Sequence, residues 1–494
     1  MSTAIQLASV RAGTPRGRWI VGAMALGSGI VFLDGTVVNV ALPSIARDLG
    51  ADLAALQWTF TAYLLTLGSL LVLGGSIGDV FGRRRAFLIG LAVFTGASVA
   101  CGLAPSVGWL IGFRAVQGIG GALLIPESLA IISATFAPED RGSAIGSWSG
   151  LAAVSAAIGP FLGGFLIDSV SWRLIFLINV PLAVAAAVIV SRHVPETRDP
   201  DASGRLDYLG AAVATLGLAG VVFALIEGPE RGFSSPIIVA FGIAGVVFLA
   251  LFPFVERRAS APMAPLEIFR RRQFVGANVT TLCVYGALGG AFVFVMLELQ
   301  SVMGYTALES GAAFAPMTLL LLTLSSRMGR LADRIGPRIP MTVGPIVAAG
   351  GFALLTRLGP GANYLPDVLP GVVTFGMGMS ITVAPLTAAV LAAIEDRRAG
   401  VASAINNAVS RIAGLLAVAL MPLAAGMAGS GAGDALEVGF PRVMWIAAGL
   451  CFAGGVVAFA TVSEHMRVEI TAHPSPHYAC HAAELAERPV EASA

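Results

Sequence analysis

The chain has 494 residues, of which 56% are hydrophobic and 12% charged, and its mean hydropathy is +0.84. Soluble globular proteins carry about 25% charged residues, so this composition excludes that class and predicts a membrane protein with many spans. The formal net charge of +1 gives no electrostatic reason to expect a nucleic-acid partner. All 30 basic residues are arginine; without lysine there is no GxxxxGK[ST] sequence, which argues against a built-in ATP motor.

Residue patterns that carry enzymatic or metal chemistry are sparse. The 4 cysteines have no CxxC or paired spacing, so we expect no disulfide framework or zinc site, and no HExxH sequence occurs. His473, His477 and His481 lie beside Cys480 in the C-terminal stretch, which we expect to be a disordered cytoplasmic tail rather than a metal site. We therefore predict that the protein is not an enzyme and has no catalytic residue, metal or cofactor.

Fourteen apolar runs are long enough to cross a bilayer, which takes about 20 residues. The first run follows Arg11, Arg16 and Arg18 and is too long for a signal peptide, so we expect an uncleaved span. The runs lie at 19–41, 56–76, 86–104, 107–133, 143–167, 172–192, 208–227, 236–255, 276–299, 306–325, 339–357, 367–391, 401–426 and 441–462.

The arginines predict how these spans are oriented. If both termini are cytoplasmic, the outside loops hold only Arg47, Arg173, Arg231, Arg357 and Arg442, and nearly all the others lie in inside segments. Cytoplasmic loops of membrane proteins carry such an excess of basic residues. We therefore predict that the N- and C-termini are cytoplasmic.

Two loops repeat one another along the chain. GSIGDVFGRRR and GRLADRIGPR share the pattern GxxxDxxGxR, and Asp79 precedes Asp333 by 254 residues. The stretches PEDRGSAIG and IEDRRAGVASAIN, and the prolines Pro126 and Pro385, recur in the same order at similar offsets. Repeated halves are typical of secondary transporters. The sequence therefore predicts two six-span halves with spans seven and eight inserted between them.

This repeat divides the chain into seven predicted parts. They are a cytoplasmic N-terminus (1–18), an N-terminal six-helix bundle (19–192), a cytoplasmic loop (193–207), two inserted helices (208–255), a basic cytoplasmic loop (256–275), a C-terminal six-helix bundle (276–462) and a cytoplasmic tail (463–494).

Four stretches resemble the major facilitator superfamily, and within it the fourteen-span drug:proton antiporter family of the multidrug efflux type. They are LDGTVVNVALP in span one, GSIGDVFGRRR after span two, RAVQGIGGALLIP in span four, and GPFLGG in span five followed by WRLIFLINVP. The resemblance implies an all-α membrane protein with the major facilitator fold, in which two six-helix bundles and two inserted helices give 14 transmembrane helices.

The resemblance also assigns expected roles to two motifs. The loop after span two implies a cytoplasmic gate that latches and releases during transport, and the Gly-Pro stretch of span five implies an antiporter motif that seals the outer side. Physically, the glycines of both stretches allow tight turns and close helix contacts. The gate residues are Gly75, Asp79, Gly82, Arg83 and Arg84, with Asp333 and Arg338 in the second half, and the antiporter residues are Gly159, Pro160, Gly163 and Gly164.

Ionisable residues interrupt the spans at Asp34, Arg114, Glu127, Glu298 and Arg411. By helical rise, Asp34 and Arg114 both lie about 10 Å from the outer face, so they can stabilise each other's ionised forms, and protonating the acid would weaken the pair. Because the resemblance implicates both residues in proton coupling, we expect Asp34 to carry the proton, with a static ion pair as the alternative. Glu127 follows a proline in span four and is either a second protonation or cation site or a snorkelling acid, whereas we expect Glu298 to reach water.

The sequence says least about which compound is transported. Aromatic and polar residues within the spans are expected to line the substrate cavity, with lipid contact or packing as the alternative for the aromatics. Those residues are Trp58, Tyr63, Gln117, Tyr285, Asn406, Asn407 and Arg411.

We predict a proton-coupled secondary transporter that exports amphipathic or cationic small molecules by alternating access. The alternatives are a dedicated exporter of a metabolite, lipid or siderophore on the same fold, or a non-transporting membrane receptor or scaffold. The expected partners are a small-molecule substrate, protons and the lipid bilayer, and we expect a monomer. The expected location is the inner membrane of a bacterial cell, as a multi-pass protein.

Overall fold

The computed structural model describes residues 10–11, 13–199, 204–260, 262–394, 399–427 and 432–463, so the histidine-containing tail lies outside the described residues. In these residues 14 helical segments are long and apolar enough to cross a membrane, which confirms the predicted number of spans. The helices are α1 (Pro15–Leu49), α2 (Leu53–Phe81), α3 (Arg83–Gly102), α4 (Val107–Thr135), α5 (Pro138–Ser169), α6 (Leu174–Leu177), α7 (Asn179–His193), α8 (Tyr208–Arg231), α9 (Pro236–Arg258), η1 (Leu266–Arg270), α10 (Arg272–Leu297), η2 (Glu298–Val302), α11 (Ala307–Ala312), α12 (Ala315–Ile335), α13 (Arg338–Leu355), η3 (Tyr364–Val368), α14 (Leu369–Ala392), α15 (Ala399–Ala424) and α16 (Ala432–Thr461).

The first helix begins earlier than its apolar run. Thr14 is the N-cap and accepts a hydrogen bond from the backbone N–H of Gly17, and Pro15 occupies the first helical position. Both are favourable start signals for a helix. Arg16 and Arg18 therefore belong to the first turn of α1, whereas Arg11 precedes the helix.

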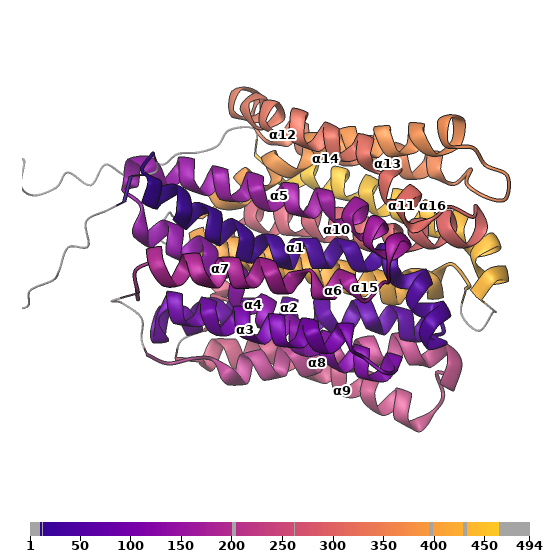
Figure 1. Ribbon diagram of the computed structural model, residues 1–494, viewed down its shortest axis with the longest axis horizontal. Helices are drawn as coiled ribbons and strands as arrows, with labels where there is room; N and C mark the ends of the chain where they lie inside the picture. Colours follow the sequence, from indigo (N-terminus) through magenta and orange to yellow (C-terminus); the bar gives the residue numbers. More distant parts are fainter. Residues whose placement is uncertain are drawn as a thin grey trace, which may run out of the picture.

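The two halves repeat the same helix packing. In the first half α1 packs on α5, and α4 packs on α2 and α3; in the second half α10 packs on α15, and α14 packs on α12 and α13. Figure 1 shows the helices running roughly parallel across the molecule, with α8 and α9 along one edge. The fold is thus two six-helix bundles with an inserted helix pair, as the sequence repeat predicts.

The inserted pair packs against both halves. Helix α8 contacts α9, and it also contacts α2 from the first half and α15 from the second. At the α2 contact the Trp58 indole donates a hydrogen bond of 2.9 Å to Glu227 and its ring lies 6.4 Å from that of Phe223. Helix α9 packs chiefly on α8, and its apolar side chains are largely exposed, as expected for a surface that faces lipid.

The two ends of the bundle differ in charge and in packing. We call the end with Arg83 and Arg272 the arginine-rich end and the other the arginine-poor end. At the arginine-poor end α5 contacts α11, where the Asp168 carboxylate accepts hydrogen bonds from the backbone N–H groups of Ala307 (3.2 Å) and Leu308 (2.8 Å). In contrast, the arginine-rich third of α5 is largely exposed. The halves are therefore closed together at the arginine-poor end.

This contact between halves requires Gly164. A Cβ atom there would overlap the backbone of Ala307 and Leu308, whereas a Cβ at Gly150 on the same helix would meet nothing within 4 Å. Overpacking of this kind costs about 1–3 kcal/mol, so we expect Gly164→Val to lower the ratio of closed to open arginine-poor ends by about 5- to 150-fold.

The measurement is the maleimide labelling rate of a cysteine at Val40, which is 0% exposed, in a background without the native cysteines. Gly164→Val should accelerate labelling, and Gly150→Val should leave the rate unchanged. Equal rates in the two variants would show that the α5–α11 contact does not close this end.

Candidate functional site

The site is built around an ion pair with no access to water. Asp34 on α1 and Arg114 on α4 are in direct contact through one carboxylate oxygen and one guanidinium nitrogen, and both side chains are 0% exposed. Removing two charges from water costs several kcal/mol per ion unless good geometry and further hydrogen bonds compensate. The pair expected from matching depth is therefore present, and its stability depends on its other partners.

Three neutral side chains complete the carboxylate's environment. Gln117 on α4 accepts a hydrogen bond from Arg114 (2.7 Å) and donates one to the second carboxylate oxygen of Asp34 (2.9 Å). The Asn179 amide of α7 donates to the same oxygen (3.4 Å), and Ser98 of α3 accepts from both Gln117 (2.9 Å) and Asn179 (2.8 Å). Gln117, one of the residues expected to line the substrate cavity, thus lies within this polar cluster.

Ser98 and Asn179 did not stand out in the sequence. Both are fully buried, and each is a polar residue within an apolar span. Buried polar groups in a bilayer need hydrogen-bond partners, so their presence was a usable signal. What the sequence lacked was any indication of which helix faces they occupy.

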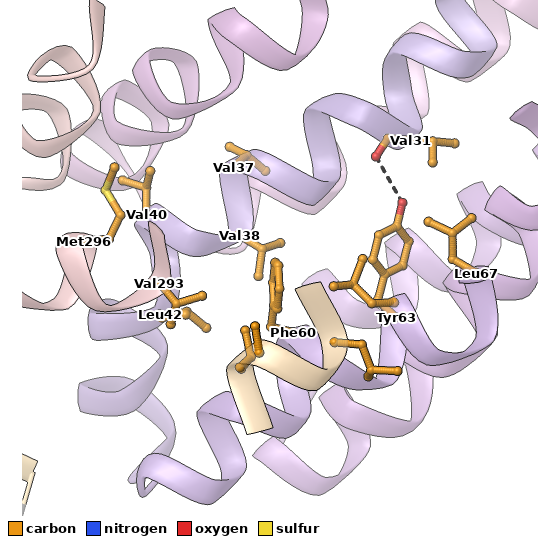
Figure 2. Close-up of a cluster of buried hydrophobic side chains, with 14 of the residues drawn as sticks. Val31, Val37, Val38, Val40, Leu42, Phe60, Tyr63, Leu67, Val293 and Met296 are labelled. Atoms are coloured by element: carbon orange, nitrogen blue, oxygen red, sulfur yellow. Dashed lines mark hydrogen bonds between the residues drawn. The ribbon is translucent and has the colours of Figure 1, made fainter. Parts of the chain in front are cut away.

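Helix α2 holds the other side of Arg114. The Arg114 guanidinium carbon lies 4.1 Å from the centroid of the Tyr63 ring, and Nε donates to the Thr59 carbonyl (3.2 Å). The Tyr63 hydroxyl in turn donates to the Val31 carbonyl of α1 (3.0 Å), as Figure 2 shows. The Nη2 nitrogen of Arg114 has no hydrogen-bond partner among the described residues. The Nη2 amino group of the guanidinium is thus left without an acceptor among the described residues.

An apolar cluster lies on the arginine-poor side of Asp34. Val38 and Leu42 of α1, Phe60 of α2 and Val293 of α10 are all buried and come together there (Figure 2). Because α10 belongs to the second half, α1 packs at this point across the interface between halves. The cluster separates Asp34 from the arginine-poor end in this state.

The antiporter motif packs against the helix that carries Asp34. A Cβ atom at Gly159 would overlap Thr36 of α1, and one at Gly163 would overlap Val37. The Thr36 hydroxyl also donates to the Ala156 carbonyl of α5 (3.1 Å). Close contact through glycines is a common way for membrane helices to pack.

An adjacent face of the same motif, one residue further along α5, meets the second half. Gly164 contacts the start of α11, and a Cβ at Gly311 of α11 would overlap the Pro160 carbonyl. Helix α5 therefore connects the helix of Asp34 to the contact that closes the arginine-poor end.

The gate residues after α2 bond within their own half. Asp79 accepts two hydrogen bonds from Arg83, at 2.9 and 2.7 Å. Glu196, which follows α7, accepts from the backbone N–H of Arg84 (3.0 Å), and Gly82 has φ +115°, where a Cβ would meet the Glu196 carboxylate. These contacts tie the loop to the segment after α7, and no hydrogen bond or ion pair among the described residues joins it to the second half.

The remaining gate residues are also placed within single halves. Gly75 faces Pro126 of α4, where a Cβ would lie 3.3 Å from the proline ring. Arg338 donates to the Phe459 carbonyl (2.9 Å) and lies 4.4 Å from the centroid of that ring. Asp333 lies in α12, but its side chain is outside the described residues.

Glu127 occupies a second buried polar position in the first half. Its side chain is 0% exposed and its carboxyl group contacts Gly78 of α2 so closely that a Cβ there would overlap it. Neither carboxyl oxygen has a hydrogen-bond partner among the described side chains and backbone groups. A snorkelling acid would reach water, so this burial disfavours the snorkelling alternative. A protonated carboxyl is the less costly form to bury in such a place.

The other candidate cavity residues divide between helix contacts and the interface. The Asn406 amide donates to Asn278 (3.2 Å) and Thr281 (2.8 Å) of α10, and Asn407 donates to the Ser403 carbonyl (3.0 Å). Trp58 faces α8, as described above. Arg411 and Tyr285 remain partly exposed at the middle of their helices.

The prediction for Glu298 was wrong. We expected this residue to reach water at the end of its span, but it is 1% exposed. It begins the π-helical turn η2, which continues the helix of α10 beyond Leu297. The helix therefore extends past the apolar run and keeps Glu298 inside the bundle.

Comparison with known proteins agrees with this architecture. A family model described as Major Facilitator Superfamily matches residues 24–418. The structure superposes on the POT family transporter PepTSo with a TM-score of 0.67 at 15% identity, covering 90% of this chain and 97% of that one. It also superposes on a bacterial homologue of the human lysosomal transporter Spinster with a TM-score of 0.65 at 17% identity, covering 91% and 97%.

Several relatives with higher sequence identity are named as resistance or export proteins. The chain is 36% identical over 421 residues to the puromycin resistance protein pur8 of Streptomyces alboniger, covering 84% of this chain and 83% of that protein. It is 34% identical over 401 residues to the multidrug resistance protein Stp of Mycobacterium tuberculosis (81% and 74%), and 33% identical over 431 residues to the tetracenomycin C resistance and export protein of Streptomyces glaucescens (85% and 78%). This chain is therefore a multi-pass membrane transporter and belongs to the Major Facilitator Superfamily.

Proposed function

We propose that the protein exports amphipathic drug-like molecules across the inner membrane in exchange for protons. The observation that carries this proposal is the buried pair of Asp34 and Arg114, which is costly to build into a membrane bundle and has a titratable partner at its centre. The similarity to resistance and export proteins supports the drug class of the cargo. A scaffold without transport has no need for such a pair.

Asp34 is the proposed proton carrier. A proton on its carboxylate removes the charge that Arg114 pairs with, and Gln117 and Asn179 must then rearrange their hydrogen bonds. Arg114 keeps the Thr59 carbonyl and the Tyr63 ring as partners. The guanidinium can therefore stay in place while α1 changes its position relative to α4.

A series of helix contacts supports a mechanical link from this carboxylate to the arginine-poor end. Helix α1 packs on α5 through Gly159 and Gly163, and α5 packs on α11 through Gly164. Because packed interfaces switch between discrete arrangements, a change in α1 biases the α5–α11 contact. The free energy of closing the arginine-poor end thus depends on whether Asp34 carries a proton.

The proposed orientation is supported by the arginine distribution. We propose that the arginine-rich end is cytoplasmic, so that cargo enters there and protons enter from the arginine-poor side. The Asp79–Arg83 pair then belongs to a cytoplasmic gate that engages the second half when that end closes. We further propose that the transporter acts as a monomer; a dedicated metabolite, lipid or siderophore cargo is the second candidate.

Replacing Asp34 by Asn is expected to abolish proton coupling. The side chain keeps its size but cannot titrate, so export driven by a proton gradient in proteoliposomes should fall at least tenfold, while substrate binding changes only a few-fold. The matched control is Asp48→Asn on the same helix. The Asp48 side chain is half-exposed and pairs with Arg173 at the arginine-poor end. Intact proton-driven export in Asp34→Asn would remove Asp34 from the mechanism.

Replacing Glu127 by Gln tests a second protonation site. Since the Glu127 carboxyl is buried without a hydrogen-bond partner, a proton bound there during transport would be lost from the variant, and export should depend less steeply on pH. The measurement is export against pH for wild type, Glu127→Gln and the exposed-acid control Glu139→Gln. An unchanged pH profile and substrate range in Glu127→Gln would mean that this acid has no transport role.

A further inference from the structure

Arg411 is a cation at the interface between halves without an acidic partner. It lies near the middle of α15, its Nε nitrogen is buried without a hydrogen bond, and no salt bridge among the described residues includes it. The nearest acid along α1, Asp34, is already paired with Arg114. The described charges at this level of the interface therefore leave one positive charge uncompensated.

Three aromatic side chains and a glycine without a side chain surround this guanidinium. Its carbon lies 5.1 Å from the centroid of the Phe32 ring, and Tyr63 and Tyr285 are near enough to interact with its charge. A Cβ atom at Gly35 would lie 3.9 Å from its Nη1 nitrogen, so Gly35 leaves that nitrogen uncovered. Phe32 and Gly35 belong to the first half and Tyr285 to the second.

These neighbours occupy the position where transporters of repeated halves bind their cargo. Substrate sites in such folds lie near the middle of the membrane at the interface between the repeats. Phe32, Gly35, Tyr285 and Arg411 are all partly exposed, although each lies near the middle of its helix. They are therefore accessible to a molecule that enters between the halves.

An uncompensated cation in a membrane protein is costly and is retained for a function. A guanidinium prefers planar, charged oxygen acceptors and also stacks on aromatic faces. The aromatic rings around it suit a flat, apolar molecule. These properties together describe a site for an aromatic compound with an acidic oxygen.

We propose that Arg411 determines specificity and selects amphipathic aromatic compounds that carry a phenolate, enolate or carboxylate group. This inference rests on the proposed export function and deepens it by replacing the expected cationic cargo with an anionic one. The anionic oxygen binds the Arg411 guanidinium, and the ring system packs between Phe32 and Tyr285. A cationic compound at the same place would be repelled.

The test uses dyes that differ in charge. Resorufin is a planar phenolate at neutral pH, its methyl ether has the same ring system without the charge, and rhodamine 123 is a cation. Proton-driven transport of each is measured in proteoliposomes with wild type, Arg411→Gln, Arg411→Lys and the exposed control Arg357→Gln. Thermal unfolding is measured for each variant with and without resorufin.

We expect wild type to transport resorufin best and Arg411→Gln to lower that transport about tenfold or more, with less than a twofold effect on the ether. Arg411→Lys keeps the positive charge but loses the planar guanidinium and its bidentate hydrogen bonds, so this variant should retain part of the resorufin transport. Because Arg411 is unpaired, Arg411→Gln should not lower the unfolding temperature, and it should remove the stabilisation by resorufin. Arg357→Gln should behave as wild type.

Several results overturn the inference. If Arg411→Gln lowers transport of all three dyes equally, or if rhodamine 123 is preferred and unaffected, Arg411 does not select anions, although the export function stands. If wild type moves none of the dyes against a proton gradient, the proposed export function fails together with this inference. If Arg411→Gln fails to fold, Arg411 has a structural role. Full resorufin transport by Arg411→Lys would then show that the planar guanidinium of Arg411 does not bind the acidic oxygen of the dye.

Discussion

An ion pair that is removed from water inside a membrane bundle must have nearly every polar atom satisfied, and the first half of this protein is arranged around that requirement. Asp34 of α1 meets Arg114 and Gln117 of α4, while α3 and α7 supply Ser98 and Asn179. Helix α2 adds a carbonyl and a ring to the arginine. Five helices are thus held in register by one charged pair, because a rotation of any of them would leave a buried polar atom unpaired.

The same constraint gives α1 a central place between the charged pair and the rest of the molecule. One face of α1 carries Asp34, another packs on the glycines of α5, and a third meets α10 through Val38, Val40 and Leu42 (Figure 2). Helix α5 then contacts α11 at the arginine-poor end. A proton that changes one buried bond therefore acts on a helix that already contacts both the closing surface and the second half.

The two halves divide the charges between them. The first half encloses an acid and a base that neutralise one another, whereas the second half brings the unpaired Arg411 to the interface. Tyr63 lies close to both guanidinium groups, against Arg114 at 4.1 Å and within reach of the charge of Arg411. In the proposed mechanism, proton binding and cargo binding would use different arginines that share one aromatic neighbour, so each would influence the other.

Much of the fold could be predicted from the sequence, because span length and the offset between Asp79 and Asp333 depend only on position along the chain. The meeting of Asp34 and Arg114 could be predicted for the same reason, since counting helical rise gives depth. Rotation about a helix axis could not be predicted, because a span that is apolar on every side has no periodicity to show which face points inward. For this reason the sequence could not show that Trp58 faces α8 rather than the interface. Nor could it show that Ser98 and Asn179 lie beside the ion pair.

The central claim is that a proton on Asp34 sets the balance between open and closed ends. Spin labels at Val170 and Leu365, both 71% exposed and on different halves at the arginine-poor end, allow the distance between these residues to be measured against pH in nanodiscs. In wild type we expect the distance distribution to change as pH falls, and in Asp34→Asn to match the low-pH distribution at every pH, with Asp48→Asn titrating like wild type. A distribution in Asp34→Asn that still follows pH as wild type does would contradict the claim.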